Sequence, residues 1–131
     1  MIAVDTNVLV RLIVGDDEVQ GAKARHLIDA CAEGNETCFV SNPVLCELEW
    51  VLETLYSASR AEVASAIQAL ASEPPFQVED AEAVQRALAQ YTNGKGDFSD
   101  YLLGEVGRSA GARTTYTFDR DLRKAAGFTL L

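Results

Sequence analysis

Short strand-like runs alternate with helical segments along this chain, and this alternation is the clearest indication of its fold class. The first run, Ile2 to Val4, is apolar and ends directly on Asp5, as a buried parallel strand often does. Further runs of strand-forming residues lie at 37–40, 76–78, 114–118 and 128–131. The order of the segments predicts an α/β fold: a parallel sheet with helices on both faces.

The segments between these runs show the 3.6-residue apolar spacing of amphipathic helices. We expect helices at residues 8–13, 22–31, 44–55, 60–71, 81–90 and 99–109. Capping side chains precede several of them, including Asp16 or Asp17, Ser41 or Asn42, and Ser59. The short break before Arg60 indicates an αα-hairpin.

The 131 residues predict one domain spanning 1–131, and a hydrophobic content of 48% is enough to bury a core. No apolar run approaches the roughly 18–20 residues of a membrane span, and the first residues lack the basic flank and apolar stretch of a secretory signal. We therefore expect a cytoplasmic protein without membrane contact. Three cysteines without a CxxC pair and a single histidine do not make a zinc set; the thiols are interpreted as core packing.

The net charge of −9 bears on the class of ligand. Proteins that bind nucleic acid without sequence preference usually carry the opposite sign, so the charge alone mildly favours a basic protein partner or metal cations. Divalent ions held among acidic groups would reconcile the charge with a phosphate substrate, because the ions invert the local field.

Four acids are expected at one edge of the sheet. Asp5 and Asp119 each follow a predicted strand, Asp100 lies in the first turn of a helix, and Glu47 borders the apolar stripe of another. Each alone is more simply a helix cap or a first-turn acid. Converging together they would repel unless cations filled the site, and an all-oxygen set selects Mg²⁺ or Mn²⁺.

Polar neighbours could support such a site. Thr6 and Asn7 follow the first acid, and Thr117 precedes the last by two residues; such groups hold carboxylates in place, although Thr6 and Asn7 could equally cap the first helix. Asp97 is either an outer ligand or an N-cap. Arg11 could touch phosphate, but a solvent-exposed role is the simpler interpretation.

Taken together, the pattern resembles the PIN-domain family, specifically the VapC-type toxins of bacterial toxin–antitoxin pairs. The resemblance spans essentially the whole chain and rests on four segments in order: IAVDTNVLVRL at 2–12, SNPVLCE at 41–47, DFSDYLL at 97–103 and TFDRDL at 117–122. It implies a five-stranded parallel sheet. It also implies an endoribonuclease using Mg²⁺ or Mn²⁺, in which Asp5, Glu47, Asp100 and Asp119 match the acidic quartet.

The same resemblance assigns Asp97 to a frequent accessory acid, and Thr6, Asn7 and Thr117 to supporting positions. Family members usually form homodimers and bind a small antitoxin, for which the hairpin from Pro43 to Ala71 is a plausible contact. Its apolar residues Trp50, Leu55 and Tyr56 are either part of that contact or part of the core. The acids suggest a mechanism in which metal-activated water attacks an RNA phosphodiester in line.

Three other classes of protein share parts of this sequence pattern. A non-catalytic acidic module could use the same fold to bind a basic partner, although no acid of the quartet is lost. A phosphotransfer receiver should show paired acids after its first strand and a lysine after a late strand, and neither is present. A DNA nuclease would need duplex-binding elements and a basic tail that this chain lacks.

Overall fold

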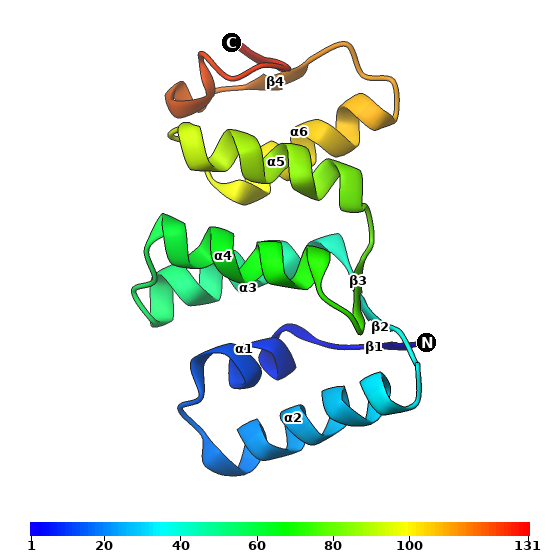
Figure 1. Ribbon diagram of the computed structural model, residues 1–131. Helices are drawn as coiled ribbons and strands as arrows, with labels where there is room; N and C mark the ends of the chain where they lie inside the picture. Colours follow the sequence, from blue (N-terminus) through cyan, green and yellow to red (C-terminus); the bar gives the residue numbers. More distant parts are fainter. The chain divides into compact units, whose positions relative to one another are not determined.

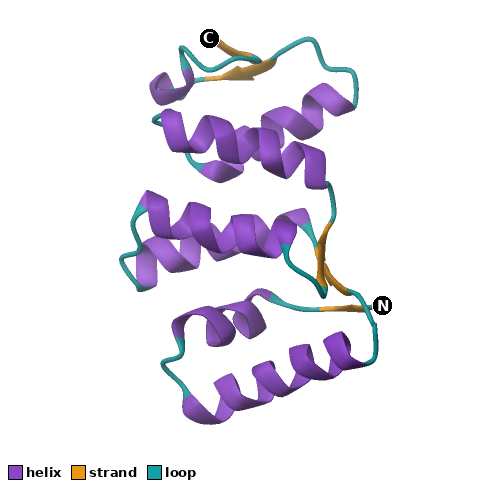
Figure 2. Ribbon diagram, in the orientation of Figure 1, coloured by secondary structure: helices purple, strands orange, loops and turns teal.

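The computed structural model describes all 131 residues, which divide into two compact units, Met1–Glu79 and Asp80–Leu131. Helices dominate both units and the strands are only two or three residues long (Figure 2). The α/β class is confirmed. The prediction of a single domain over 1–131 stays a prediction.

The first unit contains a three-stranded parallel sheet and four helices (Figure 1). The strand order is β1-β2-β3, and the register places Ile2 opposite Cys38 and Val40 opposite Val78. Helix α1 packs against α2 and α3, while α4 packs against α3 and β3. In chain order the elements are β1 (Ile2–Ala3), α1 (Thr6–Val14), α2 (Glu18–Glu33), β2 (Cys38–Val40), α3 (Asn42–Leu55), α4 (Arg60–Ser72) and β3 (Phe76–Val78).

The second unit pairs two helices with a small two-stranded sheet. Helices α5 and α6 pack closely (Figure 1), and the ring of Tyr91 meets Phe98 edge-on at 6.2 Å. Strands β4 and β5 pair in parallel. The elements are α5 (Ala81–Asn93), α6 (Phe98–Ser109), β4 (Thr115–Thr117), the 3₁₀ turn η1 (Arg120–Leu122) and β5 (Phe128–Leu130).

The five strands therefore form two parallel sheets, of three and two strands, rather than one sheet of five. Four of the five strands are shorter than the predicted runs, and Val4, Thr37, Thr114, Phe118 and Leu131 lie outside them, whereas β3 matches its predicted run at 76–78. A strand ends where its neighbour stops offering backbone partners, which composition alone does not reveal.

Capping explains where the helices begin. Asp17, Ser41 and Ser59 accept hydrogen bonds from backbone amides of the first turns of α2, α3 and α4. Gly15, with φ of 71°, ends α1 in the left-handed conformation. The predicted helix at 81–90 continues to Asn93.

Two of the three thiols lie in the core as predicted: Cys31 is 3% exposed and Cys38 is fully buried, whereas Cys46 is half-buried. None of the three cysteines forms a disulfide. Burial, followed by the nearby Cys31, raises the pKa of Cys38 to about 11, so this thiol is not a reactive thiolate. No helix has the length and apolar character needed to cross a membrane.

Candidate active site

Asp5 stands at the junction between β1 and α1. It is the N-cap of α1, with extended backbone angles, and its Oδ1 accepts a hydrogen bond of 2.7 Å from the Thr6 amide. Asp5 therefore caps the helix, which is the simpler role expected for it from the sequence. Asp5 remains solvent-exposed, so the carboxylate keeps free lone pairs for a further ligand.

Thr6 links Asp5 to Glu47, which lies on α3. The buried Thr6 hydroxyl donates to Glu47 Oε2 at 3.0 Å, while the Thr6 amide donates to Asp5. One residue therefore holds two carboxylates that are far apart in sequence. This arrangement supports the predicted positioning role of Thr6.

The surroundings of Glu47 differ from those expected. Glu47 is exposed, whereas the sequence predicted a side chain bordering the buried stripe. The helical period places it beside Val44 and Val51, but both of those are themselves only half-buried. Asn7 is also exposed and makes no hydrogen bond to either acid; it lines a cavity of about 270 Å³ with side chains of α1 and α2.

In the second unit, Asp97 and Asp100 begin α6 together. Asp97 is the N-cap of α6, which is one of the two roles considered for it from the sequence. The Asp97 amide donates to Asp100 Oδ2 at 3.0 Å. The bond orients the Asp100 carboxylate, which is half-buried, in the manner of a capping box.

Asp119 follows β4 and opens η1. Its Oδ1 accepts from the Asp121 amide at 2.9 Å, and its own amide donates to Thr117 Oγ1 at 3.0 Å. Thr117 therefore fixes the backbone of Asp119 rather than its carboxylate, so it supports the acid in a different way from the one expected. Asp119 and Asp121 are both exposed.

The acids of this unit act on one another electrostatically. The pKa of Asp100 is raised, first by burial, and the charges of Asp97, Asp119 and Asp121 add to the rise. The hydrogen bond from the Asp97 amide opposes it. A carboxyl whose pKa is raised by like charges marks a region of negative potential, which cations would relieve.

The predicted acids thus fall into two sets. Asp5 and Glu47 are brought together in the first unit, and Asp100 and Asp119 in the second. The use of all four as one site stays a prediction.

Comparison with known proteins gives the family. The family model of the PIN domain matches residues 2–128 of the chain.

The chain belongs to the PIN-domain family.

A relative in Aquifex aeolicus (strain VF5) is described as a VapC ribonuclease. It is 24% identical to this PIN-domain chain over 120 residues, which cover 92% of the chain and 88% of the relative. No solved structure matches the chain significantly.

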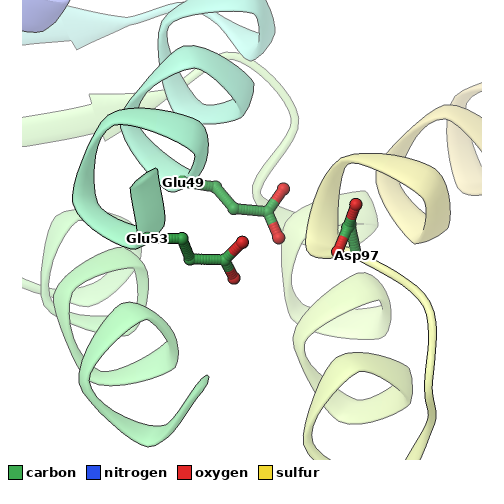
Figure 3. Close-up of side chains that lie close together, drawn as sticks. All are labelled: Glu49, Glu53 and Asp97. Atoms are coloured by element: carbon green, nitrogen blue, oxygen red, sulfur yellow. The ribbon is translucent and has the colours of Figure 1, made fainter. Parts of the chain in front are cut away.

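Two further acids of the PIN domain were missed from sequence. Glu49 and Glu53 project from α3 one turn apart, and Glu49 is only 2% exposed (Figure 3). Asp97, the third labelled side chain in Figure 3, belongs to the second unit. The sequence held one signal for Glu49, which stands between the apolar residues Leu48 and Trp50. An acid in apolar surroundings is unusual, because buried acids are rare without partners.

Arg11 has a structural role that sequence did not show. It donates from Nε to Gln20 at 2.6 Å and from NH1 to Asp16 at 3.0 Å, and the Tyr56 hydroxyl donates to the same Asp16 at 2.8 Å. The network joins α1 and α2 to the end of α3. Arg11 is therefore a paired, partly buried side chain rather than a free one at the surface.

Proposed function

We propose that this chain is an endoribonuclease that hydrolyses RNA phosphodiester bonds with Mg²⁺ or Mn²⁺ and serves as the toxin of a toxin–antitoxin pair. The observation that carries the proposal is the pairing of acids within a PIN domain. Thr6 links Asp5 to Glu47 through two hydrogen bonds, and the negative charge of Asp119 lies close enough to Asp100 to help raise its pKa. The similarity to a VapC ribonuclease supports it.

The residues present fit a hard divalent cation. The donors are carboxylate oxygens with a nearby hydroxyl, while Cys31 and Cys38 are buried in the core. Oxygen-only donors favour Mg²⁺ or Mn²⁺ over zinc. In our proposal the metal ligands are Asp5, Glu47, Asp100 and Asp119. Bound there, the cation supplies Lewis acidity, which makes water more acidic and offsets charge on phosphoryl oxygens.

The chain's own residues supply orientation. Thr6 holds Glu47 and Asp5, the Asp97 amide holds the Asp100 carboxylate, and Thr117 holds the backbone of Asp119. Groups fixed before the reaction need no reorganisation during it, which is the main way a protein lowers the barrier to phosphoryl transfer. Asp97 and Asp121 add negative charge beside Asp100.

Partners follow from the same proposal. We place the antitoxin on the α3–α4 hairpin, where Trp50 and Leu55 are 59% and 64% exposed. Exposed large apolar side chains of this kind are typical anchors in protein interfaces. A homodimer and a cytoplasmic location are part of the proposal.

The test is a cleavage assay on purified, partner-free protein. A labelled structured RNA is incubated with and without Mg²⁺ or Mn²⁺, beside Asp100→Asn as the matched control. Asparagine preserves size and can still accept from the Asp97 amide, so the variant should stay folded, which circular dichroism checks. We expect metal-dependent cleavage by the wild type that is lost in the variant.

The net charge of −9 favours one second candidate, a non-catalytic module that binds a basic protein. It becomes the better account if the folded wild type binds neither Mg²⁺ nor Mn²⁺ in calorimetry and cleaves no RNA.

A further inference from the structure

A cavity of about 460 Å³ opens in the second unit beside the turn that carries Asp119. Its size falls within the roughly 300–1,000 Å³ of ligand sites in proteins. One wall comes from the end of α5 and the following loop, which supply Asn93 and Lys95. The other comes from η1 and the turn after it, which supply Arg120, Arg123 and Lys124.

Positive charge is concentrated around this cavity, although the chain as a whole is acidic. The four basic side chains Lys95, Arg120, Arg123 and Lys124 line the cavity, out of 11 in the whole chain. Asp121 is the one carboxylate among the lining residues. In a chain of net charge −9, such a gathering predicts an anionic ligand.

These basic groups are available to a ligand. All four are exposed, and none takes part in an ion pair, whereas Arg11, Arg86 and Arg108 are all paired with acids. The cationic groups therefore keep their hydrogen-bond donors free for phosphate oxygens.

Local packing holds both walls in place. Leu122 is 2% exposed and anchors the turn, so that its neighbours Arg120 and Arg123 stay at the surface. On the other wall the Gly96 amide donates to the buried Tyr101 hydroxyl at 3.0 Å, which fixes the loop next to Lys95. The site is thus supported by buried groups on both sides.

We propose that this cavity binds backbone phosphates of single-stranded RNA next to the scissile bond. The proposal rests on the proposed ribonuclease function. Asp119 and Asp121 alternate with Arg120 and precede Arg123 on a single turn. A strand whose scissile phosphate lies at the acids therefore has neighbouring phosphates within reach of the basic side chains. Contacts of this kind position a substrate without reading its sequence.

The experiment measures RNA binding apart from cleavage. A short fluorescein-labelled single-stranded RNA is titrated with the Asp100→Asn protein, which leaves the RNA intact, and anisotropy is followed over a range of salt concentrations. Into this background we introduce Arg123→Gln with Lys124→Gln. The matched control is Lys23→Gln with Arg25→Gln, an exposed pair on α2 that changes the net charge equally.

We expect the cavity variant to bind on the order of tenfold more weakly, since charge-assisted hydrogen bonds are lost. Each lost phosphate contact should also reduce the slope of log K against log salt by roughly 0.7. The separate substitution Lys95→Gln, on the opposite wall, should reduce the slope by roughly 0.7 as well. The α2 control should bind like its parent, and circular dichroism should show all variants folded.

Equal binding and equal salt slopes for the cavity variant and the α2 control would overturn the phosphate site. If the wild type still cleaves RNA with metal, that failure leaves the ribonuclease function intact. If the wild type neither binds nor cleaves RNA, both proposals fall.

Discussion

At the scale of single residues, Thr6 is the side chain whose chemistry can be separated most cleanly from its packing. Valine has nearly the same shape but no hydroxyl, so Thr6→Val removes only the hydrogen bond to Glu47. Because Glu47 is exposed and regains water, the variant should lose at most about 1 kcal/mol of stability.

The same substitution should slow metal-dependent cleavage by roughly 10- to 100-fold, the usual effect of removing a group that orients a ligand. Thr6→Ser keeps the hydroxyl and should stay close to wild type. Cleavage rates and thermal unfolding of both variants check this. If valine and serine variants cleave equally, the hydroxyl does not orient Glu47 for the reaction.

Asp100 should make the metal-free protein less stable at neutral pH. Its raised pKa means that the folded chain holds the proton more tightly than the unfolded chain does. The resulting stabilisation is present below the ordinary aspartate pKa of about 4 and is lost as pH rises through the folded value. Asp100→Asn should therefore unfold at a higher temperature than wild type at pH 7 in a chelator, and the difference should shrink at acid pH.

Thermal unfolding of both proteins in chelator, followed across this pH range, gives the measurement. Mn²⁺ should raise the melting temperature of the wild type and reduce the gap. A variant that is less stable than wild type at every pH would contradict the electrostatic explanation.

At the scale of elements, Glu105 joins the two helices of the second unit. Only 7% exposed on α6, it accepts from Arg86 Nε at 2.6 Å and from Gln90 Nε2 at 2.9 Å, both on α5. Glu105→Ala leaves these donors without their acceptor and should cost about 2 kcal/mol. Chemical denaturation measures the change.

Glu82 supplies the matched control for Glu105. Its carboxylate lies 3.7 Å from the same Arg86, but the side chain is 90% exposed, so Glu82→Ala should barely change the denaturation midpoint. Similar losses in both variants would show that burial of Glu105 does not set the strength of the α5–α6 contact.

Sequence predicted the elements better than their contacts. Apolar period and capping residues such as Ser41 and Ser59 placed the helices, because both signals are local. Long-range partners are not local: the role of Arg11 depends on Tyr56, 45 residues away. Glu105 was missed for the same reason, since its neighbours on α5 decide that it is buried. Strand ends were overestimated because they depend on the pairing strand.

Sequence also found the acids of the candidate site more readily than their surroundings. Asp5 and Asp119 follow strands, and the runs of strand-forming residues before them predict that position. Glu47, by contrast, was expected at the buried border and is exposed. The basic cavity was not foreseen, because Lys95 and Lys124 are separated by most of the second unit in sequence.

At the scale of the whole molecule, the four proposed metal ligands come from both compact units. If they serve one site, Asp5→Asn and Asp119→Asn should each abolish metal-dependent cleavage, and the double variant should be no worse than either single one. Cleavage rates and Mn²⁺ calorimetry on the three variants test this. Independent, multiplying effects would mean that the two acid sets work separately.

The loop between α5 and α6 also sets which substitutions this protein can accumulate. A β-carbon on Gly94 would collide with the Tyr101 hydroxyl, and one on Gly96 would lie 2.5 Å from a Leu122 methyl group. Asn93 and Lys95, which alternate with these glycines, are exposed and carry no such restriction. Over evolutionary time the charge of this loop can therefore change while its path cannot. Homologues are expected to keep both glycines and, under the proposed function, to adapt to different RNAs by changing Asn93 and Lys95.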